Sequence, residues 1–128
     1  MNGAERVTGI GGVFFRANDP EALTRWYEEH LGVASPPATY GERSWQQEAG
    51  PTVFAAFPAD SEHFVRPQQQ WAINFRVNDL DAMVEQLRNA GINVDLHAES
   101  YPNGRFADLL DPEGNPVQLW EPAGSDRV

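Results

Sequence analysis

The side chains of this chain that could do chemistry are arginines, amides, one aspartate and several aromatics. Arg16 and Arg76 stand at matching positions in two similar stretches. Their guanidinium groups suit carboxylates or phosphates, and aromatic rings supply flat apolar area. The candidate ligand-binding residues are Phe14, Arg16, Trp45, Phe54, Asn74, Arg76, Asp108, Gln118 and Trp120. Together they predict a pocket for a small polar and aromatic molecule.

Each of these residue types also has a structural interpretation. A half-buried arginine is normally paired, and the available partners are Asp108, Glu48 and Glu121. The aromatic residues serve equally well as core or as contacts between subunits. The sequence therefore leaves open whether the arginines bind a ligand or form ion pairs.

Several kinds of catalysis are excluded or unsupported. The chain has no cysteine and no lysine, so thiol nucleophiles and Schiff bases on a side chain are excluded. His30, His63 and His97 do not share the spacing of a ligand pair, and we expect all three to be structurally ordinary. The catalytic residues stay unknown, although Asp108 or Glu121 beside an arginine would suit a general base.

The elements that must position these residues begin with a strand that leads into a helix. Residues 12–17 are predicted to form a strand, and Asn18-Asp19-Pro20 supplies a helix cap followed by proline at the first helical position. Apolar residues then recur at helical spacing as far as Leu31, and Gly32 ends the helix.

This unit occurs twice, which is the most informative feature of the chain. At an offset of sixty, residues 71–91 repeat residues 11–32 without a gap. At an offset of sixty-four, Gly50, Val53 and Pro58 match residues of the last predicted strand and its turn. The matched positions at the first offset are Val13/Ile73, Phe15/Phe75, Arg16/Arg76, Asn18/Asn78, Asp19/Asp79 and Ala22/Ala82.

Each helix is followed by segments with strand character. In the first half these are residues 44–48 and 52–58, and in the second half residues 93–98, 105–110 and 117–121. We therefore predict one domain over residues 1–128, with module 1 at about 8–60, a linker at about 60–70 and module 2 at about 71–122. The linker assignment rests on the prolines, glutamines and lack of periodicity in that stretch.

Strand alternation assigns faces to the predicted strands. Val13, Phe15 and Ala17 and their counterparts in the second copy are apolar, so these faces should pack on the helices. On the last strand Val117 and Leu119 join that core. The opposite face carries the arginines, Asn74, Gln118 and Trp120. Two such sheets curling together would form a concave, half-polar cleft.

Composition limits the partners of this chain. The net charge of −10 disfavours nucleic acid and anionic membranes, because both present negative charge. The acidity is explained either by solubility or by a cationic ligand. The sequence shows neither a signal pattern nor an apolar span long enough to cross a bilayer, so we expect a soluble, cytoplasmic protein.

The repeat and the terminal motif Asp-Pro-Glu-Gly-Asn-Pro-Val-Gln-Leu-Trp-Glu-Pro resemble the glyoxalase, bleomycin-resistance and extradiol-dioxygenase superfamily, also called the vicinal oxygen chelate (VOC) superfamily. The resemblance covers residues 10–122. It implies an α+β fold of two tandem βαβββ modules in an open, curled mixed sheet, usually assembled as a homodimer.

The resemblance also implies where a metal would bind. Metal-binding members of the superfamily place one His, Gln or Glu on each of four strands. The corresponding positions here hold Gly12, Phe54, Ala72 and Gln118. Three of the four lack a donor atom, so the sequence predicts no metal site and no cofactor.

These observations predict a metal-free small-molecule-binding homodimer, similar in kind to the antibiotic-resistance members of the superfamily. The alternative is an enzyme, a glyoxalase-like lyase or dioxygenase, with an atypical metal site or an acid-base carboxylate. An interaction module without a small ligand has no sequence feature in its favour.

Overall fold

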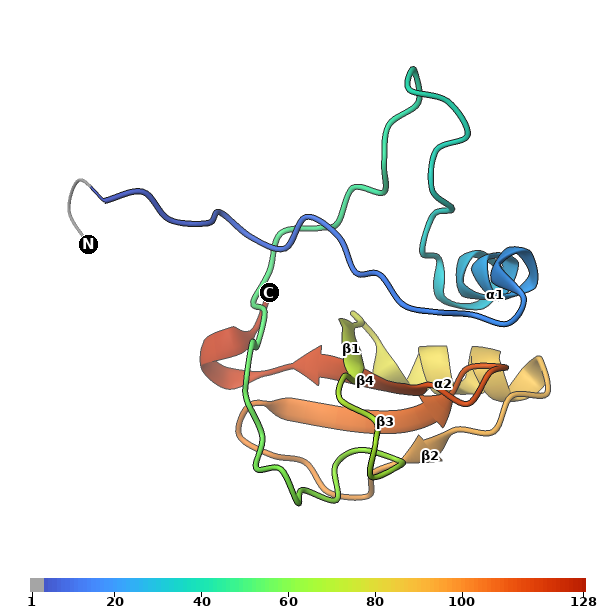
Figure 1. Ribbon diagram of the computed structural model, residues 1–128. Helices are drawn as coiled ribbons and strands as arrows, with labels where there is room; N and C mark the ends of the chain where they lie inside the picture. The colour runs from blue at the N-terminus through green and yellow to red at the C-terminus, as the bar shows by residue number, and fades with distance from the viewer. Residues whose placement is uncertain (1–3) are drawn as a thin grey trace.

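The computed structural model describes residues 4–128, which form an α+β fold around a mixed, open sheet (Figure 1). The sheet has the strand order β1-β4-β3-β2, and it is not closed. Strand β1 runs parallel to β4, whereas the β4–β3 and β3–β2 pairs are antiparallel. The elements in chain order are α1 (Pro20–Trp26), the π-helix η1 (Tyr27–Leu31), β1 (Ile73–Arg76), α2 (Leu80–Asn89), β2 (Asp95–Leu96), β3 (Gly104–Leu110), β4 (Pro116–Pro122) and the 3-10 helix η2 (Gly124–Asp126).

Both helices begin and end where the repeated caps predict. The Asp19 side chain accepts a hydrogen bond from the Ala22 amide, and that of Asp79 accepts one from the Ala82 amide. After the π-helical turn, Gly32 adopts the left-handed conformation with φ 73°, which glycine tolerates best.

The second half forms the complete strand-helix-three-strand unit that its sequence predicts. The face assignment is confirmed in β4, because Val117 and Leu119 lie in the buried core while Gln118 is on the opposite side. Helices α1 and α2 share that core. Its buried members are Leu23, Tyr27, Leu80, Val84, Leu87, Val94, Ala107, Leu109, Val117 and Leu119.

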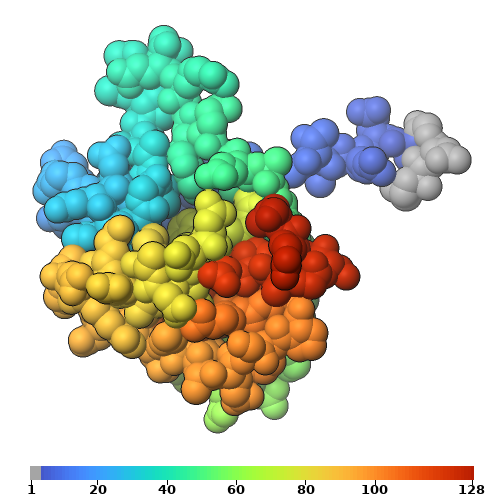
Figure 2. Space-filling view, turned by 180° about the vertical axis from the view of Figure 1, so that it is seen from behind, coloured from blue at the N-terminus to red at the C-terminus, as the bar shows by residue number. Residues whose placement is uncertain are grey.

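The first half differs from the sequence prediction. Residues 12–17, 44–48 and 52–58 have no strand assignment, although their counterparts in the second half do. In Figures 1 and 2 the segments before and after α1 project from the body of the molecule. A strand requires a partner for its backbone hydrogen bonds, and these segments have none in the chain from residue 4 onward. The alternating pattern alone was therefore insufficient to predict strands here.

The helix of the first half is attached to the sheet through the turn between β3 and β4. Asp111 is buried at 4% exposure, and its carboxylate accepts a hydrogen bond of 2.7 Å from the Tyr27 hydroxyl of η1. It also accepts bonds from the Glu113 and Asn115 amides and from Asn115 Nδ2. A buried carboxylate is tolerated when donors satisfy it, so this group fixes both the turn and the helix.

The neighbouring glutamate of the same turn holds the start of α1. Glu113 Oε1 and Oε2 accept hydrogen bonds from the Asn18 and Asp19 amides, at 2.6 and 3.0 Å. At the other helix, Glu121 Oε1 accepts one from the Leu80 amide. Each helix N-terminus is therefore held by a carboxylate from the β4 region, where negative charge is favourable.

Among residues 4–128, no helix combines the length and the apolar character that crossing a membrane requires.

We expect Tyr27→Phe to lower the free energy of unfolding by about 1.5–3 kcal/mol near neutral pH, because Asp111 loses one of its donors. Burial, followed by the Asp111 hydrogen bond and charge, raises the pKa of Tyr27 well above its ordinary 10.0. Its contribution to stability is therefore complete below pH 10 and lost as the pH rises further. Urea unfolding between pH 7 and 11 should show the wild type and the variant converging above pH 10.

The matched control is Tyr40→Phe, since Tyr40 is fully exposed. It should change neither the stability nor its pH dependence. A stability difference for Tyr27→Phe that stays constant up to pH 11 would contradict the assignment of that difference to the hydroxyl.

Candidate functional site

A row of polar side chains crosses the helix-free face of the sheet. Asn74 Nδ2 on β1 donates to Gln118 Oε1 on β4 at 2.9 Å, and Gln118 Nε2 donates to Asp108 Oδ1 on β3 at 3.0 Å. Asp108 Oδ2 lies 2.6 Å from Nε2 of His97, which directly follows β2. Strand register causes this alignment, because Asn74, Gln118 and Asp108 are direct partners across the strands.

An aromatic group lies beside this polar row. The rings of Phe106 and Trp120 are parallel, with an interplanar angle of 3° and centroids 6.3 Å apart. Tyr101 packs edge-on against Phe106 at 6.0 Å. Trp120 is on the predicted face but is only 3% exposed, and its Nε1 donates to the Asn103 carbonyl. It therefore packs beside Phe106 and offers little surface to a ligand in the single chain.

Neither of the two arginines forms an ion pair within residues 4–128, although ion pairing is one of the two possibilities that the sequence leaves open. Arg76 Nη2 donates to the Glu48 backbone carbonyl at 2.9 Å, and a Cβ added to Gly50 would clash with its guanidinium group. Arg16 is exposed beside a shallow hollow that Glu113 and Asn115 also line. Within residues 4–128, neither arginine lies within ion-pair distance of a carboxylate.

The remaining predicted site residues lie in the projecting first half. Phe14 is 96% exposed and Phe54 is 81% exposed, and Trp45 is 40% exposed. In the single chain the structure therefore does not bring them together with the sheet residues. Their role in a site stays a prediction.

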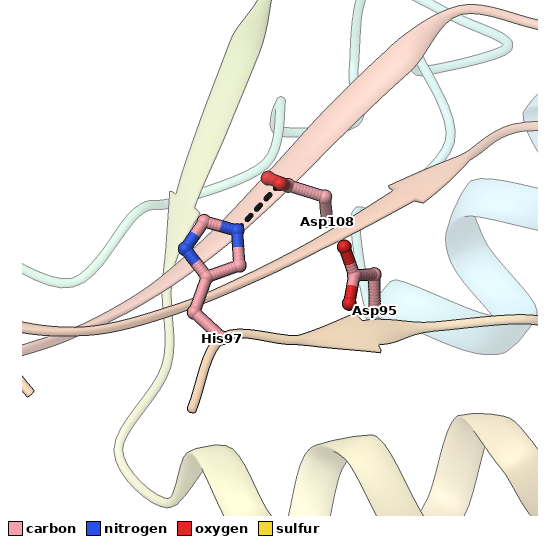
Figure 3. A group of neighbouring side chains, drawn as sticks. All are labelled: Asp95, His97 and Asp108. Atoms are coloured by element: carbon pink, nitrogen blue, oxygen red, sulfur yellow. Dashed lines mark hydrogen bonds and ion pairs between the residues drawn. The ribbon is translucent and has the colours of Figure 1, made fainter. Parts of the chain in front are cut away.

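The sequence analysis missed Asp95 and His97, which join Asp108 in one cluster (Figure 3). Ligand atoms of the three residues all lie within 4.8 Å of one another. The expectation that His97 is structurally ordinary is not supported, because it contacts a carboxylate and is half-buried. Alternation places Asp95 and His97 on one face, but only the register of β2 against β3 reveals Asp108 opposite.

The family comparison identifies the fold. The model of the Glyoxalase/Bleomycin resistance protein/Dioxygenase superfamily matches residues 9–119. The chain belongs to this superfamily. The sequence resemblance is confirmed, and so is the α+β fold class.

Two curated relatives and one solved structure refine this placement. The anthracycline biosynthesis protein DauV of Streptomyces sp. (strain C5) is 35% identical over 140 residues, covering 98% of this chain and 49% of DauV. The anthracycline biosynthesis protein DnrV of Streptomyces peucetius is 46% identical over 50 residues, covering 39% of this chain and 18% of DnrV. The chain thus spans about half the length of DauV and less of DnrV. TnmS3, an antibiotic binding protein from Streptomyces sp. CB03234, shares the fold with a TM-score of 0.58 at 19% identity, covering 94% of this chain and 100% of TnmS3.

The superfamily's metal-ligand positions do not fit a metal in this chain. Gly12, Ala72 and Phe54 offer no side-chain donor. The fourth position, Gln118, has its oxygen bonded to Asn74 and its nitrogen bonded to Asp108. Its amide is therefore engaged at both ends, and these four positions do not supply a metal ligand set.

Gly104 is required where the aromatic group meets the sheet. It adopts φ 137°, and an added Cβ would clash with the Glu121 carbonyl and lie 2.7 Å from Trp120 Nε1.

We expect Gly104→Ala to destabilise the protein by roughly 2–4 kcal/mol and to displace the Trp120 ring. Urea unfolding and tryptophan fluorescence measure both effects. Gly11→Ala is the matched control, because nothing lies within 4 Å of its added Cβ; equal stability of the two variants would contradict this role of Gly104.

Proposed function

We propose that this protein is a small-molecule-binding member of the superfamily, of the antibiotic-resistance kind, which acts as a homodimer without the superfamily's catalytic metal. The observation that carries the proposal is the polar row Asn74–Gln118–Asp108 on one open sheet face, beside the half-buried Phe106 ring that packs parallel to the buried Trp120. A flat aromatic molecule with polar groups along one edge matches this surface.

The polar row retains hydrogen-bonding capacity for such a ligand. Asn74 Oδ1 has no hydrogen-bond donor in the chain from residue 4 to 128, and its side chain is exposed. Arg76 pairs with Trp120 across β1 and β4. Its guanidinium group has further N–H donors beyond the one that contacts the Glu48 carbonyl. Carbonyl and hydroxyl groups on the rim of an aromatic ligand would bind these donors and acceptors.

The relatives support the same class of ligand. DauV and DnrV are anthracycline biosynthesis proteins, and TnmS3 is an antibiotic binding protein. Anthracyclines are planar polycyclic aromatics with polar edges and an amino sugar. The net charge of −10 favours such a cation at long range. We therefore propose a planar aromatic antibiotic, or a biosynthetic precursor of one, as the ligand.

The projecting first half supports the homodimer. Val13, Phe14, Val53 and Phe54 are each more than half exposed, on segments whose backbone lacks strand partners. Their repeat counterparts Ile73, Asn74, Val117 and Gln118 all lie in strands of the sheet, and Val117 is part of the buried core. A second copy would provide partner strands, cover the apolar side chains and bring the aromatics of the first half to the sheet face.

An enzymatic alternative is favoured by one contact. The 2.6 Å approach of His97 Nε2 to Asp108 orients the imidazole, leaving Nδ1 directed away from that carboxylate (Figure 3). A histidine oriented by a carboxylate is suited to move a proton to or from a bound substrate. In this second candidate the protein is a lyase or dioxygenase of the superfamily with His97 and Asp108 as its acid-base pair.

Titration with an anthracycline, followed by the ligand's own fluorescence, tests the binding proposal. We expect saturable binding with one ligand per subunit and an affinity that an excess of chelator does not change. Asn74→Ala should weaken binding about five- to tenfold, because it removes a hydrogen bond worth about 1 kcal/mol or slightly more. Gln118→Ala should also weaken binding, because Asn74 loses the partner that orients its amide.

The control variant is Asn89→Ala, at the exposed end of α2 on the other side of the sheet. It should bind like the wild type. Loss of binding in chelator would contradict the metal-independent mechanism. Conversion of the anthracycline to a new product, abolished by His97→Ala, would favour the enzymatic alternative.

Sedimentation velocity tests the assembly. We expect the wild type to sediment as a dimer and Phe14→Asp to shift toward the monomer, because a charge in a covered apolar contact is unfavourable. Gln68→Asp adds the same charge at an exposed position of the linker and should leave the dimer intact. A wild-type monomer throughout the micromolar range would refute the homodimer.

A further inference from the structure

The cluster of Asp95, His97 and Asp108 has the composition and placement of a metal site. Asp95 and His97 are two residues apart on the edge strand β2 and its continuation, and the His97 amide donates to the Phe106 carbonyl of β3. Asp108 stands on β3 directly opposite Asp95. One imidazole and two carboxylates thus converge from adjacent strands, and the donor atoms lie within 4.8 Å of one another (Figure 3).

The two carboxylates have no arginine beside them, and the one basic group that contacts either of them is the His97 imidazole on Asp108, within residues 4–128. Like charges at directly opposite positions of an antiparallel pair destabilise it. Within residues 4–128, no arginine forms an ion pair with Asp95 or Asp108. Strand β2 pairs with β3 through only two residues, so this repulsion acts where the sheet is weakest. A bound cation would remove the repulsion and connect the two strands.

The carboxylate of Asp108 is already oriented as a metal ligand would be. Gln118 Nε2 donates to Oδ1, which leaves Oδ2 facing His97. Asn74 in turn fixes Gln118. Hydrogen bonds of this kind, from residues that do not touch the metal, set the direction of ligating carboxylates and strengthen metal binding.

We propose that Asp95, His97 and Asp108 bind one divalent transition-metal ion of the zinc, cobalt or manganese class, which links the edge strand β2 to β3. Imidazole and carboxylate donors suit these ions. Bonds of about 2.1 Å in a tetrahedral arrangement place ligand atoms about 3.4 Å apart. His97 Nε2 and Asp108 Oδ2 must therefore separate slightly from 2.6 Å, while the Asp95 carboxylate moves inward. Water completes the coordination, since the side chains of His97 and Asp108 are 29% and 47% exposed.

This site differs from the superfamily's metal positions. None of its three residues stands at positions 12, 54, 72 or 118. Nor does it rest on the proposed function, because the proposed ligand contacts need no metal. The ligand and the metal are tested by different probes, so either proposal can fail alone.

Cobalt(II) titration of the full chain, stripped of metal by chelator and then desalted, tests the site. We expect visible d–d absorption bands that saturate at one cobalt per subunit, and zinc should displace them. Saturating zinc should also raise the melting temperature by about 5 °C, as a ligand of the folded state does. His97→Ala and Asp95→Asn should each abolish the bands and the thermal shift. Asp95→Asn is nearly isosteric at an exposed position, so it keeps the test valid if His97→Ala fails to fold.

Two further variants separate the possible sites. His63→Ala should retain full cobalt binding, because His63 lies in the linker and stacks on Phe57. Gln118→Ala should weaken binding about ten- to a hundredfold without abolishing it. Absence of any bands up to millimolar cobalt would overturn the proposal. Bands that survive His97→Ala but vanish in Gln118→Ala would overturn it in favour of the superfamily position.

Discussion

The fold depends on one buried carboxylate, that of Asp111. It is the only charged side chain in the core of residues 4–128, and four donors from the η1 helix and its own turn satisfy it. Burying a charge is unfavourable unless such partners are present, so the turn and the packed helix stabilise each other. Pro112 and Gly114, with φ 83° at the glycine, shape the turn that presents the amides. The Asp-Pro-Glu-Gly-Asn motif therefore joins the two halves of the chain as well as reversing its direction.

The position of this turn also determines the site. Because β3 and β4 leave the turn in fixed register, Asp108 stands opposite Gln118 and Phe106 opposite Trp120. The parallel pairing of β1 with β4 then adds Asn74 beside Gln118. Each polar partner thus comes from a strand whose register is set by core residues on the other face, such as Val117 and Leu119. A one-residue slip would bury the polar row and expose the core.

The sequence predictions were accurate where the deciding interactions are short in sequence, and less accurate where they join distant segments. The helices were predictable because their signals are local: Asp19 and Asp79 cap within three residues, and Gly32 ends the first helix. The strands of the second half were predictable because their partners lie in the same unit. The strands proposed for the first half show equal alternation but no partner strand in the described chain, so their pattern was misleading for the single chain.

The site was predictable only in part for the same reason. Alternation placed Asn74, Gln118 and Asp108 on one face, but their hydrogen bonds depend on register. The cluster of Asp95, His97 and Asp108 was missed because Asp95 lies in, and His97 directly follows, an edge strand of two residues. A strand this short gives too little pattern for its pairing to be predicted from sequence. Arg76 donates to the Glu48 backbone carbonyl and not to a carboxylate. This contact depends on the path of the loop that contains Glu48, which the sequence pattern does not predict.

The missing donors at three of the superfamily's ligand positions and the polar row meet at one residue, Gln118. A glutamine at position 118 that served a metal would have to present its oxygen toward the open face, with nothing competing for it. Here Asn74 occupies that oxygen and Asp108 occupies the nitrogen, so the side chain is held within the plane of a hydrogen-bonded row. With no side-chain donor at positions 12, 54 and 72, and with Asn74 bonded to Gln118, this face presents a hydrogen-bonded polar row in place of the superfamily's ligand set.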